Sequence, residues 1–269
     1  MKQIYSYQDP DFNLSRSLTA RPNQADFRLH THQQAELYYF VSGSGTFHIE
    51  GSAYALAPGD LLLMQSAESH YIELDTTQPY DRMVLHFNMD VLAQLDPGGY
   101  LLQPLLDRKP GKQNRYLPHQ FAGGSCEHYF RTMMTREPDP RVSVFAGLVP
   151  LLHELCAIRS RSGETEASQP DTVEYRILRY LNQNIHKPIT LETVCREFYI
   201  SKSQLCRVFR SCTGVTVKQY LTAKRLVRAK QLLDAGAQPT HVYSQCGFSE
   251  YSSFYRAYVK FYGISPGKQ

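Results

Sequence analysis

One pattern occurs twice in the last hundred residues of this 269-residue chain, at an offset of 49 residues, and it constrains the fold of that segment. The first copy, SKSQLCRVFRSCTG (201–214), opens with Ser201 and Gln204 at the spacing of a capping box and ends at Gly214, a typical helix stop. Its apolar residues recur at helical spacing on one face: Leu205, Val208, Phe209 and Cys212. A helix with one core face and one outward face is therefore predicted.

The second copy, SEYSSFYRAYVKFYG (249–263), repeats this arrangement and ends at Gly263. The positions predicted to be buried are Phe254, Ala257, Tyr258 and Phe261. A short helix is expected before each copy, at 191–198 and 240–247, and a long helix between them at 219–233. Two helix-turn-helix units on one connecting helix are predicted.

Positive charge is concentrated in the same segment. Residues 173–269 hold 15 Lys and Arg against 5 Asp and Glu, whereas residues 1–172 hold 14 against 20. Basic side chains on a helical reader bind DNA phosphates through counterion release, while contacts to base edges supply sequence choice. A solvated face on a structural helical domain is the alternative, and the doubling of the motif argues against it.

Segment 173–269 resembles the paired helix-turn-helix domain of the AraC/XylS family of bacterial transcription regulators. The resemblance rests on the 49-residue offset and on two stretches, RLVRAKQLL (225–233) and CGFSEYSSFYRAYVKFYGISP (246–266). It implies binding to double-stranded DNA. The family usually continues for a few residues past the position of Gln269.

The outward faces of the two reader helices supply the predicted DNA contacts. Arg207 and Arg256 are the best candidates for base readout, because a guanidinium can bind both major-groove acceptors of guanine. Their predicted neighbours at the bases are Ser203, Gln204, Cys206, Ser252 and Tyr255. The predicted phosphate contacts are Lys202, Arg210, Lys224, Arg225, Arg228 and Lys260. Entry into successive major grooves requires the two helices to lie roughly 34 Å apart.

The first half of the chain has the sequence pattern of short strands joined by tight turns. Residues 36–64, ELYYFVSGSGTFHIEGSAYALAPGDLLLM, alternate aromatic or β-branched runs with Gly and Pro turns, which favours an antiparallel barrel or sandwich. His30-x-His32-x3-Glu36, followed by Pro58-Gly59-Asp60 and His70, resembles the cupin barrel. The predicted fold class is α+β with two domains: an N-terminal cupin-like antiparallel β-barrel with flanking helices, and a C-terminal all-α domain of two helix-turn-helix units joined by a long helix.

A barrel mouth lined by polar side chains is a typical small-molecule site. The predicted effector contacts are Arg28, His30, His32, Glu36, Tyr38, His70, Arg82 and His86. The family resemblance implies a hydroxyl-rich effector such as a sugar. His30, His32, Glu36 and His70 are also the ligand set of metal-dependent cupin enzymes, with His30 and His32 expected on one side of a strand. We favour hydrogen-bonding roles, with no metal and no cofactor, and keep a metal as the alternative.

The predicted domains are 1–159 for effector binding and dimerisation, 160–171 as a polar linker and 172–269 for DNA binding. Two apolar helical stripes precede the linker: Phe145, Leu148, Leu152 and Leu155, and upstream Tyr129, Phe130, Met133 and Met134. Such stripes are usually core, yet they also resemble the helices through which subunits of this family associate, so a homodimer is expected. No apolar run approaches the ~20 residues of a membrane span, and a cytoplasmic location is expected.

The sequence thus predicts a DNA-binding transcription regulator, an activator by family resemblance, that responds to a small molecule and has no enzymatic activity. Two alternatives stay open. The first is a metal-dependent cupin enzyme or metal sensor fused to a DNA-binding domain, and the second is a ligand-free regulator controlled by abundance or by a partner protein.

Overall fold

A computed structural model of the chain describes residues 1–27, 29–32, 34–66, 68–93, 95–108, 111–136, 138–161, 173–213, 216–234 and 236–267. The chain divides into two compact units: Met1–Phe27 with His32–Gln169, and Arg28–Thr31 with Pro170–Gln269. We refer to them as the sheet unit and the helical unit. The expected linker, 160–171, lies almost wholly outside the described residues, because only Ser160 and Arg161 are described.

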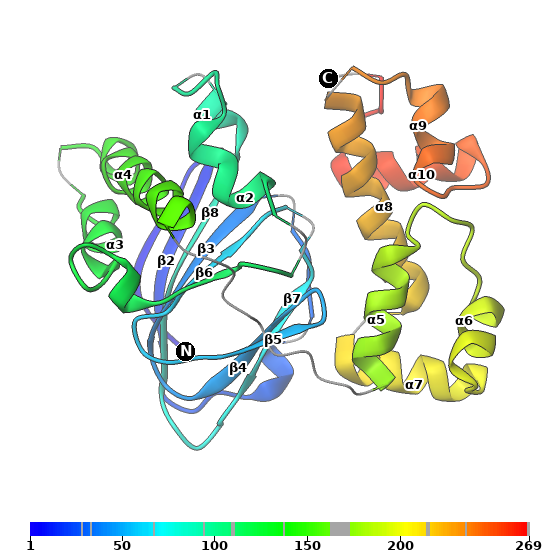
Figure 1. Ribbon diagram of the computed structural model, residues 1–269, viewed down its shortest axis with the longest axis horizontal. Coiled ribbons are helices and arrows are strands. Elements are labelled where there is room, and N and C mark those ends of the chain that lie inside the picture. The colour runs from blue at the N-terminus through cyan, green and yellow to red at the C-terminus, as the bar shows by residue number, and fades with distance from the viewer. Residues whose placement is uncertain are drawn as a thin grey trace. The chain divides into compact units, whose positions relative to one another are not determined.

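The sheet unit consists of two antiparallel sheets packed face to face (Figure 1). The larger sheet has the strand order β1-β2-β8-β3-β6-β9 and the smaller sheet the order β5-β4-β7. The strands are β1 (Lys2–Gln8), β2 (Phe12–Thr19), β3 (Ala35–Ser42), β4 (Gly45–Ile49), β5 (Ser52–Ala55), β6 (Leu61–Met64), β7 (His70–Leu74), β8 (Tyr80–Phe87) and β9 (Arg115–Tyr116). The predicted antiparallel sheet domain is confirmed.

Alternation along β3 assigns its side chains to two different cores, because successive residues of a strand point to opposite faces. Leu37 and Tyr39 join the core between the larger sheet and the helices, whereas Tyr38 and Phe40 join the core between the two sheets. Opposite Glu36, the register places His86 on β8 and Met64 on β6. One face of the larger sheet therefore packs on helices and the other packs on the smaller sheet.

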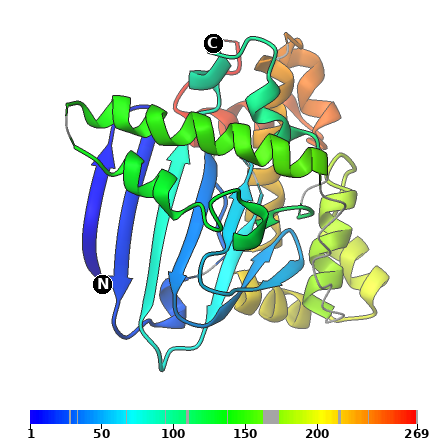
Figure 2. The same ribbon diagram turned by 60° about the vertical axis from the view of Figure 1, so that its left-hand side comes forward.

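Helices cover the outer face of the larger sheet (Figure 2). The helices of this unit are α1 (Asp90–Ala93), α2 (Gln103–Leu106), α3 (Glu127–Met133) and α4 (Pro140–Arg161), with short 3-10 turns at Gln24–Asp26, Tyr100–Leu102 and Pro118–Gln120. Both apolar stripes predicted from the sequence lie here. The stripe residues that are fully buried in this core are Phe130, Met133, Leu148, Leu152 and Leu155. They are core residues of one chain, so these residues do not themselves form a subunit seam, and association of two subunits through the helices stays a prediction.

Helix α4 is long and apolar enough to cross a membrane by length and composition alone, with a mean hydropathy of 1.5 over its most apolar window. The sequence expectation of no such segment therefore needs correction. Half of that window is buried, because Leu148, Leu151 and Leu155 pack against the sheet. Pro150 lies within the helix, and its side chain is exposed. The helix belongs to the core of the sheet unit.

The helical unit contains six helices within its described residues. They are α5 (Val173–Gln183), α6 (Leu191–Phe198), α7 (Lys202–Thr213), α8 (Val217–Asp234), α9 (Pro239–Gln245) and α10 (Tyr251–Tyr262). In Figure 1, α7 and α10 lie near opposite ends of α8. The predicted helix-turn-helix units and connecting helix are confirmed, and α6 has the predicted bounds.

Candidate functional site

The first helix-turn-helix unit is defined by two local caps. The hydroxyl of Thr190 accepts a hydrogen bond from the backbone NH of Thr193 at 3.2 Å, and the hydroxyl of Thr193 accepts one from the NH of Thr190 at 3.1 Å, which starts α6. At the start of α7, the hydroxyl of Ser201 accepts from the NH of Gln204 at 3.2 Å, as the sequence predicts. Between the two helices, Tyr199 adopts a left-handed conformation with φ 54°. These features set the turn that presents α7.

Helix α7 separates its two faces as predicted. Leu205 and Phe209 are buried, and the ring of Phe209 meets that of Tyr220 on α8 edge to face, with centroids 5.5 Å apart. The exposed residues of its other face are Lys202, Ser203, Gln204, Cys206, Arg207 and Arg210. The side chain of Cys212 and the whole of Gly214 lie outside the described residues. The exposed face is therefore free of apolar core residues and available for a partner.

Helix α10 repeats this arrangement with one difference. Phe254 and Tyr258 are buried, and the predicted contact residues Ser252, Tyr255, Arg256 and Lys260 are exposed. Phe261, expected in the core, is 36% exposed. Tyr262 takes its place, because the buried stripe continues in steps of four residues from Tyr258, and the Tyr262 hydroxyl donates to the carbonyl of Leu226 at 3.3 Å. Gly263 ends the helix in a left-handed conformation, φ 73°, as predicted.

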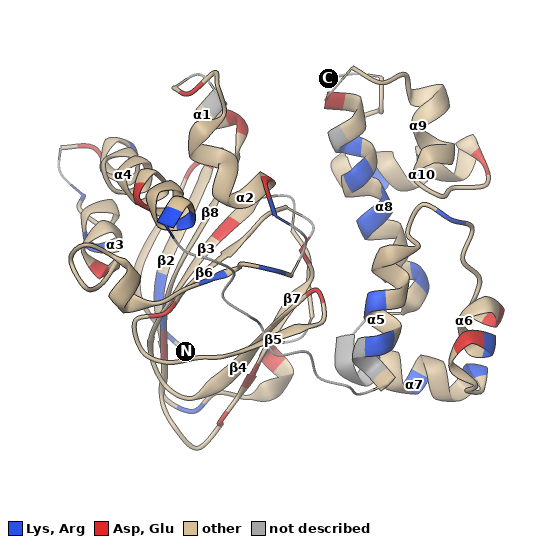
Figure 3. Ribbon diagram, viewed as in Figure 1, with Lys and Arg blue, Asp and Glu red and all other residues tan. Residues whose placement is uncertain are grey.

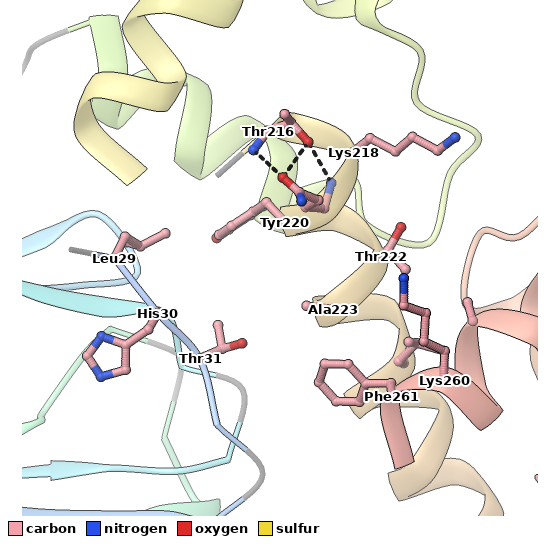
Figure 4. Close-up of a pocket in the computed structure, with 13 residues that line it drawn as sticks. Leu29, His30, Thr31, Thr216, Lys218, Tyr220, Thr222, Ala223, Lys260 and Phe261 are labelled. Carbon is pink, nitrogen blue, oxygen red and sulfur yellow. Dashed lines mark hydrogen bonds between the residues drawn. The ribbon is translucent and has the colours of Figure 1, made fainter. Parts of the chain in front are cut away.

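A single helix, α8, supports both readers. Thr216 and Gln219 cap its start: the backbone NH of Thr216 donates to Gln219 Oε1 at 2.9 Å, and the NH of Gln219 donates to Thr216 Oγ1 at 3.2 Å (Figure 4). Its first half contacts the first helix-turn-helix motif through Tyr220. In its second half, Leu226, Ala229 and Leu233 are buried against the second motif. The separation of the readers is thus set by one continuous helix. The predicted spacing of one DNA turn stays a prediction.

The side chain of Arg225 makes contacts within the protein that the sequence did not predict. Its Nε donates to the carbonyl of Ile185 at 3.0 Å and its Nη2 donates to the carbonyl of Lys187 at 2.8 Å. The guanidinium also lies 5.9 Å from the ring centroid of Phe248, and burial lowers its pKa. A half-buried side chain with these partners fixes the loop after α5, so Arg225 has a structural role that the sequence did not predict, and its phosphate contact stays a prediction. Lys224 is also half-buried, whereas Arg228 is exposed.

Basic residues lie along α5, α7 and α8, whereas α6 carries both acidic and basic residues (Figure 3). Lys202 Nζ lies 3.2 Å from Glu192 Oε1, an exposed ion pair that joins the first turns of α7 and α6. Within the helical unit, a groove of about 660 Å³ also runs beside α8, between the two helix-turn-helix motifs. Its basic lining residues are Lys218, Arg225, Arg256 and Lys260. Lys218, which is exposed, was not among the predicted contacts, because the connecting helix was predicted to begin one residue later, at Gln219, whereas α8 begins at Val217.

In the sheet unit, three imidazoles surround one carboxylate oxygen. The Nε2 atoms of His32, His70 and His86 lie 2.6, 3.0 and 3.4 Å from Glu36 Oε2. Glu36 and His70 are buried, and His32 and His86 are half-buried. Ligand-capable atoms of His32, Glu36 and His70 all lie within 4.8 Å of one another. We refer to these four residues as the His–Glu cluster.

Strand pairing and chain direction account for this cluster. Glu36 and His86 face each other across β3 and β8 of the larger sheet, and His70 begins β7 of the smaller sheet. His32 precedes β3 in irregular chain, so the expectation that His30 and His32 share a strand is wrong. His30 is exposed and groups with the helical unit, within Arg28–Thr31. Arg28 lies outside the described residues.

The ionisation of Glu36 depends on these imidazoles. Burial alone would raise the pKa of its carboxyl group, but positive charge on His70 and hydrogen bonds from His32, His70 and His86 outweigh that effect and hold the pKa well below its ordinary value. The carboxylate is therefore ionised and buried among nitrogen atoms. Such a group needs compensating positive charge.

The remaining predicted effector residues form an aromatic group in the same unit. The hydroxyls of Tyr38 and Tyr80 are hydrogen-bonded to each other, and burial raises the pKa of Tyr38. The guanidinium of Arg82 lies 4.6 Å from the centroid of Tyr80 and 5.4 Å from that of Phe27. Aromatic and aliphatic side chains fill the space between the two sheets: Tyr38, Phe40, Phe47, Ile49, Tyr54, Leu62, Met64, Ile72 and Tyr80.

Comparisons with known proteins match both halves of the chain. Residues 194–268 match the sequence model of a helix-turn-helix domain, and residues 15–125 match that of an AraC-like ligand binding domain. The chain is 23% identical over 267 residues to the HTH-type transcriptional activator RhaS of Escherichia fergusonii, covering 96% of this chain and 92% of that protein.

A second relative matches a shorter region. The "Probable transcriptional regulator LumQ" of Photobacterium leiognathi is 38% identical over 88 residues, which is 32% of this chain and 36% of that protein. Among solved structures, ToxT from Vibrio cholerae O395 aligns over 97% of each chain with 11% identity and a TM-score of 0.39.

Proposed function

Because the chain belongs to the AraC family of transcription regulators, we propose that it is an activator that binds double-stranded DNA through α7 and α10 and responds to a small molecule bound by its sheet unit. The observation that supports DNA binding most directly is the pair of reader helices on one connecting helix, each with an exposed polar and basic face. The relatives are transcription regulators, and we propose no enzymatic activity for this chain.

Within this function, Arg207 and Arg256 contact bases and their exposed neighbours on α7 and α10 support that contact. The phosphate backbone between the two major-groove segments runs along the groove beside α8, where Lys218 and Lys260 provide positive charge. Lys202, Arg210 and Arg228 bind flanking phosphates. Because Arg225 has two carbonyl partners, its contribution is to the shape of the groove rather than to phosphate binding.

Selection of bound DNA from a random pool tests this assignment. Arg207→Ala and Arg256→Ala should each relax the preference at one position and cost about 1 to 3 kcal/mol on the selected site. Arg228→Ala should weaken all sequences alike and reduce the salt dependence by roughly one phosphate contact. Arg131→Ala, an exposed change in the sheet unit, is the matched control. Unchanged affinity and preference in both reader variants would contradict the proposal.

The candidate effector is a carbohydrate, which the family resemblance suggests. An effector acts only through different affinities for two arrangements of the protein. Binding of sugars to the full chain should raise its thermal stability and change its DNA affinity together. If a broad panel of sugars changes neither quantity, a regulator controlled by abundance or by a partner protein is favoured.

We further propose that the protein is a cytoplasmic homodimer and that the outward face of α4 is its contact surface. The apolar residues of that face that are exposed or half-buried include Val142, Ala146, Pro150 and Ala157. Val142 is 59% exposed. Sedimentation should show a dimer that Val142→Lys weakens, while Arg131→Ala leaves it intact. A monomer at all concentrations would contradict this part of the proposal.

A further inference from the structure

We propose that the second reader helix, α10, reads thymine: the rings of Tyr251 and Tyr255 contact the C5-methyl groups of thymine bases beside the base that Arg256 binds. This inference rests on the proposed function, in which α7 and α10 enter the major groove, and it adds the class of base that one reader prefers. Its test compares two chemical forms of one DNA site, so its failure is distinguishable from a failure of the proposed function.

The two tyrosines form an exposed aromatic pair at the start of α10. Tyr251 is the first residue of the helix and Tyr255 follows one turn later. They are 37% and 41% exposed, and their ring centroids lie 6.2 Å apart with the ring planes at 43°. Ser252 and Arg256, the next residues along the chain from each ring, are exposed as well. Because recognition helices contact base edges through their N-terminal residues, the pair lies where base contacts are made.

The core of the second helix-turn-helix motif supports this pair. The ring of Tyr251 meets that of Tyr243 on α9 edge to face, with centroids 5.8 Å apart, and its centroid lies 5.9 Å from that of Phe254, which is buried. The ring of Tyr255 packs in turn on that of Tyr251. Rings that are already supported on one side lose little conformational freedom when a partner covers the other side. The exposed surface of the pair therefore suits an apolar partner.

The first reader helix has different residue types at the same positions. The 49-residue offset places Lys202 and Cys206 of α7 at the positions of Tyr251 and Tyr255. Both Lys202 and Cys206 are exposed. In each helix, an exposed arginine follows the second of these positions. The two readers therefore share the residue type that suits guanine and differ beside it, so the two halves of the DNA site should differ in base composition.

Thymine is the base that suits two exposed rings. In the major groove, guanine, adenine and cytosine present hydrogen-bonding groups, whereas thymine adds an apolar C5-methyl group. A ring over a polar base edge would remove water from donors and acceptors without replacing the lost hydrogen bonds, which is costly. A ring over a methyl group removes water from two apolar surfaces at once. Burial of one methyl group corresponds to an affinity change of about four-fold.

Replacement of single thymidines by deoxyuridine tests the proposal with the full chain. Deoxyuridine lacks the C5-methyl group but keeps the base pairing and the hydrogen-bonding groups of thymidine. The DNA is the site selected from the random pool, and the base preference that Arg256→Ala relaxes identifies the half bound by α10. We expect thymine at one or two positions beside that base. Each deoxyuridine there should weaken binding of the wild type by about three- to five-fold.

Two variants of Tyr255 assign this effect to its ring. In Tyr255→Ala, deoxyuridine and thymidine should be bound equally well at one or more of these positions. Tyr255→Phe should keep the difference, because it removes only the hydroxyl group. Both variants change an exposed side chain, so their melting temperatures should stay near that of the wild type. Deoxyuridine in the half bound by α7 is the control, since its effect should be the same in the wild type and in Tyr255→Ala.

Three results would overturn the proposal. The first is a selected site without thymine beside the Arg256 position, or one in which deoxyuridine there leaves the affinity unchanged. The second is an equal response of Tyr255→Ala and the wild type to deoxyuridine. The third is loss of the difference in Tyr255→Phe, because the hydroxyl group would then be the reader. If Arg256→Ala still relaxes a base preference, the proposed function stands and the thymine contact alone fails. A chain that selects no DNA sequence contradicts both.

Discussion

Arg108 and Glu68 form a buried, two-pronged ion pair in the sheet unit: Nη1 lies 2.7 Å from Oε1, and Nη2 lies 2.6 Å from Oε2. Both side chains are almost completely buried. The carboxylate also accepts from the backbone NH groups of Gln65 and Gly111, and from Asn114. The pair therefore fastens the irregular chain after α2 to the loop between β6 and β7.

Removal of Arg108 should destabilise the sheet unit strongly. Arg108→Ala leaves the carboxylate of Glu68 buried without its main cation, which typically costs about 3 to 5 kcal/mol. Urea denaturation would measure this change. Arg131→Ala removes an exposed pair with Glu127 and should cost less than about 1 kcal/mol. Similar losses in the two variants would contradict the importance of the buried pair.

The same pair predicts a dependence of stability on pH. Burial alone would raise the pKa of Glu68, but the charge and hydrogen bonds of Arg108 outweigh it and lower the pKa below 4.5. A lowered carboxyl pKa contributes stability that is fully present above the unfolded value and is lost as the pH falls through the folded pKa. The free energy of unfolding should therefore fall below pH 4.5 in the wild type, and less steeply in Glu68→Gln. Equal slopes would refute the assignment.

Arg225→Ala should lower the stability of the helical unit. It removes two charge-assisted hydrogen bonds to the carbonyls of Ile185 and Lys187, worth about 1 to 3 kcal/mol for a half-buried side chain. Arg225→Lys should not restore this stability, because one ammonium group does not reproduce the geometry of a guanidinium. Thermal denaturation measures the loss of stability. DNA titrations at several salt concentrations, made well below the melting temperature, show whether Arg225 also contacts a phosphate. A salt dependence reduced by one contact would return Arg225 to the phosphate set.

Gly147 marks a close contact between α3 and α4. A Cβ atom at this position would lie 2.4 Å from the carbonyl oxygen of Tyr129 and 2.5 Å from Met133 Cγ. Gly147→Ala should therefore lower the free energy of unfolding by about 1 to 3 kcal/mol, despite the better helix propensity of alanine. Gly123→Ala has no such neighbour and should be nearly neutral. An unchanged melting temperature in Gly147→Ala would show that the two helices can separate at little cost.

The helical unit was the more predictable part of the fold. Periodicity identifies the face of a helix from residues a few positions apart, which is why Leu205, Phe209, Phe254 and Tyr258 were predicted correctly. The position of the Arg225 guanidinium depends on hydrogen bonds to backbone carbonyls some 40 residues earlier in the sequence. Periodicity does not predict such long-range partners.

Long-range pairing also explains the errors in the sheet unit. The sequence placed His30 and His32 on one strand, whereas His32 lies in irregular chain before β3. The register of β3 against β8, which spacing does not encode, is what brings His86 to Glu36. The apolar stripes of α3 and α4 were identified, but their spacing does not show whether a sheet or a second subunit covers them. The structure shows that the sheet of the same chain does so.

Strand β3 separates the two hydrophobic cores of the sheet unit. Glu36 and Tyr38 point to one side of the strand, and Leu37 and Tyr39 point to the other. Peptide units are stiff, so any tightening of the chain around Glu36 also tilts Leu37 beneath the helical layer. A small molecule bound beside Glu36 would thus act on the packing of Leu37 through half a pleat, without a hinge or a moving lid. Such a sensor would report occupancy as a change in the packing of its own helices.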